Sequence, residues 1–267
     1  MSDLQIGIPC GPNSELFANF LIKSIYKTMS NDISYEIILG LNKPNVKIDL
    51  ILNDLKNSNI RFVKKYSSYT SSHGHADCLN LILDNMTSKW GIFLDADVAV
   101  LTKNWEIQLI DQLVNKVAMV GSEYHKTDGK IVDRPNVITC AFDIEIFKKL
   151  KIDFMPSMKT IEIDDFNQKI FGGRIGTKIC LDTGCDMIEK LINEGYDTKT
   201  LKIISPRYSD THDQLKLLSI NDRGEEYHLN GVPISTHIGR SLTRSFNDDK
   251  VIMNWKHSVD EWLNGKI

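Results

Sequence analysis

Short apolar runs and longer amphipathic runs alternate through the first half of this 267-residue chain, and this alternation restricts its fold more than any other feature. Runs such as "LQIGIPC" and "YEIILGLN" have the length of buried strands, whereas "SELFANFLIKSIYKTM" and "ADCLNLILDNM" carry apolar residues at helical spacing. Strands that alternate with helices are typical of a mainly parallel sheet with helices on both faces. We therefore predict an α/β fold.

Further elements follow from the same patterns. Strands are predicted at "IRFVKKY", "WGIFLD" and "VAMVGSEY", and helices at "VKIDLILNDLKNS" and "NWEIQLIDQLVNK". We expect Ser14 to cap the first helix, whose apolar face includes Leu16, Phe17 and Leu21. After Tyr124 the pattern weakens. It predicts a strand at "VITCAF", helices at "DIEIFKKL" and "DTGCDMIEKLINEGY", and a last helical turn at "VDEWLNG".

Composition excludes several classes of protein. A hydrophobic fraction of 42% and a charged fraction of 25% fit a soluble globular chain, and a formal net charge of -3 gives no reason to expect a nucleic-acid partner. We expect no transmembrane segment, because no apolar run approaches the roughly 20 residues that cross a bilayer. The start lacks a signal-peptide pattern, and five cysteines without tight spacing suggest reduced thiols. We expect a cytoplasmic protein.

The run "WGIFLDAD" ends a predicted buried strand with two aspartates, Asp95 and Asp97. Ligands bind at the carboxyl ends of the strands in such sheets, and Mg²⁺ and Mn²⁺ prefer oxygen ligands. The pair therefore predicts a divalent metal site that can hold a diphosphate. The alternative is that the two side chains cap the helix near Asn104 or line a solvated turn.

The ordered series of motifs in the first 100 or so residues resembles the nucleotide-sugar-binding half of a glycosyltransferase of the GT-A fold, most similar to the large inverting family 2. "IGIPCGPNSELFANFLIKSIYKTM" resembles the opening strand, turn and helix of that family. "GHADCLNLILDNMTSKWGIFLDAD" resembles its later helix and the strand that ends in D-x-D. The resemblance implies a Rossmann-like GT-A fold and a metal-dependent transfer of sugar from a nucleoside-diphosphate sugar to an acceptor hydroxyl, with inversion.

The resemblance also implies roles for donor-site residues. Asp97 would be the principal ligand of Mn²⁺ or Mg²⁺, and Asp95 would contact the ribose or reach the metal through water. Further implied contacts to the nucleotide sugar, for which we expect a UDP-sugar, are Pro9, Asn13, Asn42 and Asp77. The chain departs from the family where the second strand usually ends in an acidic residue that reads the base, because Leu41 stands there.

The second half would supply the acceptor site. We expect residues 1–124 to bind the nucleotide sugar and residues 125–267 to bind a carbohydrate or other hydroxyl acceptor, both within one compact unit. The family places an acidic general base at a helix start, and Asp182 is our preferred candidate over Asp186. Asp182 is also suited to cap that helix. Asp164 and Asp165 are further candidates for the base.

A C-terminal histidine often completes the metal site in this fold. We expect His237, in "STHIGRS", to be that ligand, with His228 as the second choice. Arg240 and Arg244 would contact the diphosphate, because guanidinium suits phosphate geometry.

The sequence contains motifs for other chemistries. A zinc site could include His73, His75 and Cys78, but no second cluster completes a set of four ligands. We therefore expect this segment to be a loop beside the diphosphate. The run "FGGRIG" is too short for a dinucleotide-binding fingerprint. We expect it to form a loop near the acceptor. A phosphohydrolase of the haloacid dehalogenase type, with Asp95 as nucleophile, also uses a D-x-D strand end. A non-catalytic module that binds sugar nucleotides or glycans is the other alternative.

Overall fold

The computed structural model describes residues 2–55, 59–69, 71–123, 135–156, 158–160, 178–180, 183–184, 186–206, 212–217, 224–238 and 249–266. Its strands are β1 (Leu4–Cys10), β2 (Tyr35–Leu41), β3 (Ile60–Lys64), β4 (Trp90–Leu94), β5 (Val98–Val100), β6 (Val117–Ser122), β7 (Asn136–Asp143), β8 (Met158–Thr160), β9 (Lys178–Cys180), β10 (Asp197–Ile204), β11 (Glu225–Leu229) and β12 (Val232–His237). Its helices are α1 (Glu15–Thr28), α2 (Ile48–Leu52), α3 (Ser71–Asn85), α4 (Trp105–Ile110), α5 (Ile144–Lys149), α7 (Met187–Asn193) and α8 (Asp249–Leu263), with a 3₁₀ turn at His212–Gln214.

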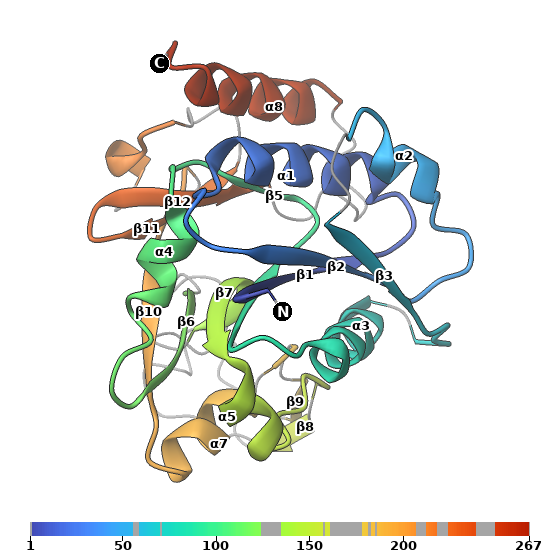
Figure 1. Ribbon diagram of the computed structural model, residues 1–267, viewed down its shortest axis with the longest axis vertical. Helices are drawn as coiled ribbons and strands as arrows, with labels where there is room; N and C mark the ends of the chain where they lie inside the picture. Colours follow the sequence, from blue (N-terminus) through green and yellow to red (C-terminus); the bar gives the residue numbers. More distant parts are fainter. Residues whose placement is uncertain are drawn as a thin grey trace.

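Ten of these strands form one sheet in the order β3-β2-β1-β4-β7-β6-β10-β11-β12-β5, and β8 pairs with β9 separately. Strands β1 to β4 are parallel to their neighbours within this group, so their carboxyl ends share one edge (Figure 1). Beyond β4, the pairings are antiparallel apart from that of β6 with β10. The α/β prediction is confirmed, whereas the prediction of a mainly parallel sheet holds only for the first four strands.

Apolar cores lie on both faces of the sheet. One core joins Leu4, Ile6 and Ile8 of β1 to α1, and the other joins Phe93 of β4 to α3, α5 and α7. Figure 1 shows α1 on one side of the strands and α3 on the other. The near-continuous apolarity of β1 and β4 is therefore explained by burial on both sides. The face of α3 carrying Leu79 is buried, as its spacing predicts.

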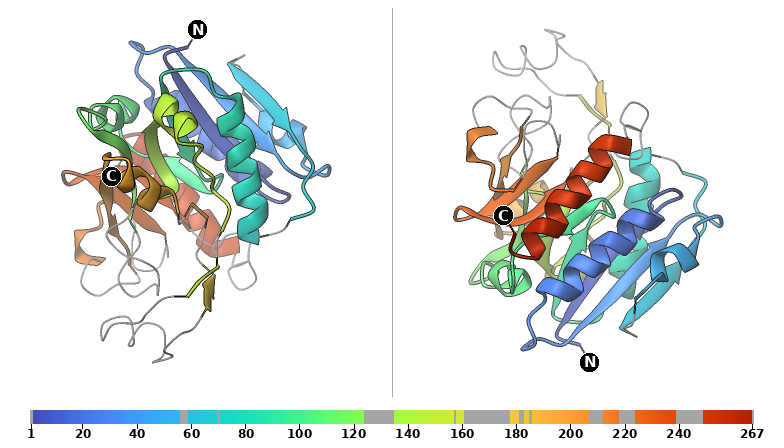
Figure 2. Two further views of the ribbon diagram at one scale, coloured as in Figure 1. Left: turned by 90° about the horizontal axis from the view of Figure 1, so that it is seen from below. Right: turned by 90° about the horizontal axis from the view of Figure 1, so that it is seen from above.

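Helix α8 lies beside α1 and adds a third apolar cluster, in which Phe17 of α1 and Ala99 of β5 meet Trp255 and Val259 of α8 (Figure 2). The Trp255 ring lies 5.6 Å from the Phe20 ring, centroid to centroid. The indole of Trp255 also donates to Thr236 Oγ1 at 3.0 Å. Helix α8 therefore packs against β5 and β12, the strands at one end of the sheet.

Several local predictions are wrong. Ser14 precedes α1 but does not cap it, because its hydroxyl donates to the Gly11 carbonyl at 2.6 Å. Leu16 is 58% exposed, so it lies off the buried face of α1. Helices α2 and α4 are shorter than their patterns suggest, and the expected last helical turn is the end of the 15-residue α8. Strand β5 has three residues and was not predicted.

Strands from both expected halves, residues 1–124 and 125–267, belong to the one large sheet, since β4 pairs with β7 and β5 pairs with β12. The division of labour between the halves stays a prediction. Within the described ranges, the helices are too short or too polar to cross a bilayer.

Candidate metal and nucleotide-sugar site

The two aspartates form the turn that joins β4 to β5. Val98 N–H donates to the Asp95 carbonyl at 3.1 Å, which closes the turn, and Asp95 N–H donates to the Ile138 carbonyl at 2.9 Å. Asn104 occupies the position before α4, and β5 separates it from the aspartates. The alternative in which the aspartates cap that helix is therefore wrong.

Strand β5 brings His237 to the aspartates. It pairs antiparallel with β12 in a register that places Val98 opposite His237, and Ile238 N–H donates to the Asp97 carbonyl at 3.3 Å. One ligand atom each from Asp95, Asp97 and His237 lies within 4.8 Å of the others. In the described ranges, this is the only set of three or more histidine, cysteine or acidic side chains that lie so close together. These are the three residues predicted to bind the metal.

The side chain of His237 is held from both sides. Its Nε2 atom is 3.3 Å from Asp97 Oδ1, and its Nδ1 atom is 2.9 Å from Glu225 Oε1. Glu225 lies directly opposite His237 on β11 and also accepts the hydroxyl of Tyr227 at 2.8 Å. A carboxylate behind a ligating imidazole fixes its tautomer and orientation. Sequence reasoning missed Glu225, because only the β11–β12 register reveals its partner.

Charge around His237 favours the imidazolium. Burial lowers the pKa of His237, but the carboxylates of Asp97 and Glu225 oppose this effect and hold the pKa well above its ordinary value. In the metal-free protein the positively charged ring therefore lies between two carboxylates. A metal cation bound beside Asp97 would likewise offset negative charge at this site.

Asp95 has a partner of its own. His75, near the start of α3, places its Nε2 atom 2.9 Å from Asp95 Oδ1. His73 lies elsewhere, against the ring of Tyr69 at 5.9 Å between centroids. Cys78 is buried, and the metal-type cluster of the described residues contains neither His73, His75 nor Cys78. This set of side chains does not fit a zinc site.

The predicted nucleotide contacts lie along the carboxyl edge of the parallel strands. Pro9 pairs with Gly40 near the ends of β1 and β2, and Asn13 adopts the left-handed conformation in the following turn, with φ of 70°. Asn42 follows β2 directly and is 7% exposed. Its Nδ2 atom donates to the Gly74 carbonyl at 2.6 Å, which connects β2 to α3.

Asp77 lies inside α3 and not at the start of that helix. Helix α3 begins at Ser71, so Asp77 lies in its second turn, where it pairs with Lys65 at 3.4 Å. The backbone amides around Asp77 belong to the helix interior. These amides are therefore engaged within the helix, and the contact of Asp77 with the nucleotide sugar stays a prediction.

The predicted acceptor side is only partly described. Asp182, Asp164, Asp165, Arg240, Arg244 and the run "FGGRIG" lie outside the described residues. Asp186 precedes α7 but does not cap it, and it does not belong to the metal-type cluster of described residues. His228, the second choice for the metal ligand, is buried with Nε2 2.6 Å from Glu226 Oε2 and does not belong to the cluster of Asp95, Asp97 and His237.

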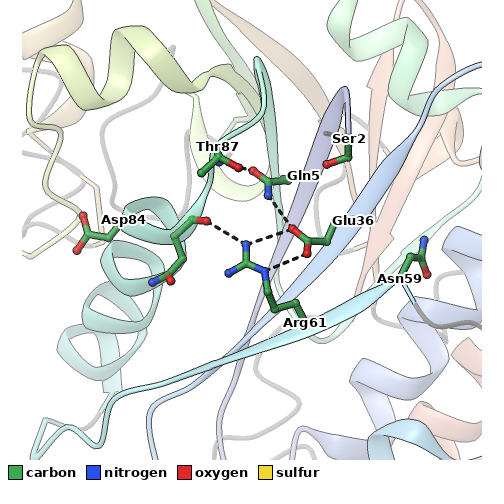
Figure 3. A pocket seen from close by; sticks show the side chains of 8 residues that line it. Ser2, Gln5, Glu36, Asn59, Arg61, Asp84 and Thr87 are labelled. Carbon is green, nitrogen blue, oxygen red and sulfur yellow. Dashed lines mark hydrogen bonds and ion pairs between the residues drawn. The ribbon is translucent and has the colours of Figure 1, made fainter.

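A hollow of about 760 Å³ lies at the other edge of the parallel strands (Figure 3). Its charged pair, Glu36 and Arg61, is joined by hydrogen bonds of 2.9 and 3.1 Å, and Gln5 donates to Glu36 at 2.7 Å. Arg61 also donates to the Asn85 carbonyl at 3.0 Å. These bonds join β1, β2, β3 and the end of α3, far along the strands from Asp95.

No model of a known protein family matches the sequence, and no curated protein matches it. Solved structures do. A mannosyltransferase from Pyrobaculum calidifontis, PcManGT, in complex with GDP-Man and Mn²⁺, matches with a TM-score of 0.52 and 13% identity over 74% of this chain and 54% of that one. The bifunctional glycosyltransferase WbbM matches with a TM-score of 0.49 and 14% identity, over 75% and 39% of the two chains.

The S. aureus protein TarS, residues 1–349, is similar over 99% of this chain and 83% of its own, with a TM-score of 0.43 and 13% identity. The chain spans about half the length of the mannosyltransferase that it matches. At this level of identity the likeness to the mannosyltransferase is evidence of fold alone. It shows that this chain has the α/β fold of the GT-A glycosyltransferases.

Proposed function

We propose that this protein is a metal-dependent glycosyltransferase that moves a sugar from a nucleoside-diphosphate sugar to an acceptor hydroxyl. The observation that carries the proposal is the cluster of Asp95, Asp97 and His237 at the carboxyl end of β4. Open α/β sheets bind their ligands at this edge. Two carboxylates and an imidazole there form a ligand set for a divalent cation that leaves positions for a diphosphate.

The spacing of these side chains fits Mn²⁺ or Mg²⁺. Ligand atoms about 2.1 Å from a cation and at right angles to one another are about 3 Å apart. Asp97 Oδ1 and His237 Nε2 are 3.3 Å apart, and Asp95 supplies a third group within 4.8 Å. A cation held by these residues would neutralise the negative charge that develops on the departing diphosphate.

Residues 1–124 would bind the donor in this proposal. Pro9 lies near the carboxyl end of β1, Asn13 lies in the turn that follows, and Asn42 follows β2 and contacts α3. We propose that these residues border the nucleotide, with a UDP-sugar as the donor to test first. GDP-mannose, the ligand of the similar mannosyltransferase from Pyrobaculum calidifontis, is the second donor to test.

Residues 125–267 would bind the acceptor. We propose that Asp182 removes the proton of the acceptor hydroxyl, with Asp186 as the alternative base, so that a single displacement inverts the anomeric centre. Arg240 and Arg244 are proposed to contact the diphosphate.

The test is a panel of nucleotide sugars incubated with the protein and Mn²⁺, Mg²⁺ or EDTA, with release of nucleoside diphosphate as the readout. We expect slow, metal-dependent hydrolysis of one donor in the absence of acceptor. Asp97→Ala should reduce this turnover by about 100-fold or more. Asp111→Ala, an exposed aspartate at the end of α4, is the matched control and should behave like the wild type.

Other outcomes identify the alternatives. Release of inorganic phosphate without response to sugar nucleotides would favour the phosphohydrolase with Asp95 as nucleophile. Binding of a sugar nucleotide without turnover, in the presence of a wide set of acceptors, would favour a non-catalytic module. Retention of the anomeric configuration would contradict the role given to Asp182 and leave the metal site intact.

A further inference from the structure

We propose that His75 is a positioning residue of the metal site, where it fixes the carboxylate of Asp95 by a hydrogen bond to Oδ1. The inference rests on the proposed function and extends it, since neither the D-x-D pattern nor the metal cluster includes His75. The contact joins Nε2 of His75 to Asp95 Oδ1 at 2.9 Å, across 20 residues of sequence.

The direction of this hydrogen bond follows from the chemistry of the two groups. An ionised carboxylate can only accept hydrogen bonds, so the proton lies on Nε2 of His75. Bonds to an ionised group are stronger than those between neutral groups. The side chains of His75 and Asp95 are 28% and 21% exposed, so water competes with the bond only in part. His75 therefore restricts the rotation of the Asp95 side chain.

The backbone that precedes His75 is anchored at two residues. The Gly74 carbonyl accepts Nδ2 of the buried Asn42 at 2.6 Å, and the Ser72 carbonyl accepts the hydroxyl of Thr183 at 3.2 Å. A side chain at position 74 would place its Cβ 2.9 Å from the Tyr69 carbonyl oxygen, so glycine allows this close approach. The first turn of α3 is thus tied to β2 and to residue 183. The backbone that carries the His75 imidazole toward Asp95 is therefore held in place.

This contact gives the two aspartates different tasks. Asp97 is next to the imidazole of His237, which is itself a candidate ligand, so both groups can turn to one cation. Asp95 has one oxygen engaged by His75 and offers the other to the metal or to the donor. We infer that Asp95 binds through a single oxygen. Loss of His75 would free Asp95 to rotate and would weaken metal binding without removing a ligand.

The experiment measures Mn²⁺ binding alone, by the loss of the free-ion signal in electron paramagnetic resonance, without substrate or turnover. Loss of a partner behind a metal ligand typically weakens affinity about 10- to 100-fold. We expect His75→Ala to weaken Mn²⁺ binding by about 10-fold or more. His75→Gln, which can present an amide N–H near the place of Nε2, should recover most of the affinity.

His73→Ala is the matched control, since His73 lies in the same helical turn but contacts Tyr69, and its affinity should equal that of the wild type. Thermal unfolding of each variant with EDTA shows whether α3 remains folded. Wild-type affinity in His75→Ala, or an equal loss in the alanine and glutamine variants, would overturn the inference.

The benchmark is Asp97→Ala. If Asp97→Ala abolishes Mn²⁺ binding and His75→Ala does not affect it, only the role of His75 is rejected. If Asp97→Ala leaves Mn²⁺ binding unchanged, the proposed function is rejected and this inference with it.

Discussion

Glu225 and His237 lie opposite one another on β11 and β12, with Glu225 Oε1 2.9 Å from His237 Nδ1. The Glu225 carboxylate accepts the Nδ1 proton, which leaves Nε2 directed at Asp97, 3.3 Å away. The ring is thus oriented by a residue that does not itself belong to the cluster. This arrangement makes the affinity of the site depend on a strand pairing as well as on its ligands.

Glu225→Ala should weaken Mn²⁺ binding by about 10- to 100-fold, because the imidazole loses the acceptor that holds it. Tyr227→Phe removes only the hydroxyl that donates to Glu225 at 2.8 Å and should have a smaller effect in the same direction. Titration with Mn²⁺ alone measures both. Equal affinities in the wild type and Glu225→Ala would show that strand β12 alone orients His237.

Acid should weaken metal binding through His237. The carboxylates of Asp97 and Glu225 raise the pKa of His237 well above 6.5 against the opposing effect of burial, and the metal must displace the proton from Nε2. Mn²⁺ affinity should therefore rise with pH until His237 is neutral. Calorimetry in buffers of different ionisation enthalpy should detect proton release below that pKa, and a pH-independent affinity would contradict this account.

The same pKa shift predicts the opposite trend for the stability of the metal-free protein. A histidine whose pKa is raised by folding stabilises the fold fully below its unfolded pKa of about 6.5 and loses this effect as pH rises through the folded value. The difference in melting temperature between the wild type and His237→Gln, both in EDTA, should therefore shrink as pH rises. A constant difference would show that the imidazolium does not contribute.

Some of these features could be predicted from sequence and others could not. Asp95 and Asp97 are recognisable because their signal is local, an apolar run that ends in two acids. Strand β5 is only three residues long, Val98–Val100, and belongs to the same apolar stretch, so periodicity did not separate it from its surroundings. His237 was predicted from the family resemblance, which implies a C-terminal histidine, whereas Glu225 and His75 depend on contacts between distant segments. Register and tertiary docking determine such pairs, and no local pattern records them.

Helix α8 should support the strand that carries His237. Trp255 is fully buried and donates to the hydroxyl of Thr236, the residue before His237, at 3.0 Å. Thr236→Val leaves the indole N–H without this acceptor and should lower the free energy of unfolding by about 1–3 kcal/mol. Trp255→Phe loses the same hydrogen bond together with part of the packing against Phe20.

A double-mutant cycle tests this coupling. Denaturant unfolding of Thr236→Val, Trp255→Phe and the double variant should show that the double variant loses less stability than the sum of the two single losses. Additive losses would mean that the hydrogen bond does not couple α8 to β12.

Glu106 should make the stability of the fold depend on pH far from the metal cluster. Its side chain is fully buried in α4, with Oε1 accepting the Ser30 N–H at 2.9 Å and no hydrogen-bond partner for Oε2 among the described residues. Burial raises the pKa of Glu106 above its ordinary value of 4.5.

An acid whose pKa is raised by folding contributes less to stability as pH rises from the unfolded pKa to the folded one. Glu106→Gln keeps an acceptor for Ser30 but cannot ionise, so the melting temperature of the wild type relative to this variant should fall as the pH rises above about 4.5. Glu145 is an acid in the first turn of the equally short α5, and Glu145→Gln is the control that should leave the pH profile of the melting temperature unchanged. Parallel profiles for Glu106→Gln and the wild type would show that ionisation of Glu106 does not destabilise the fold.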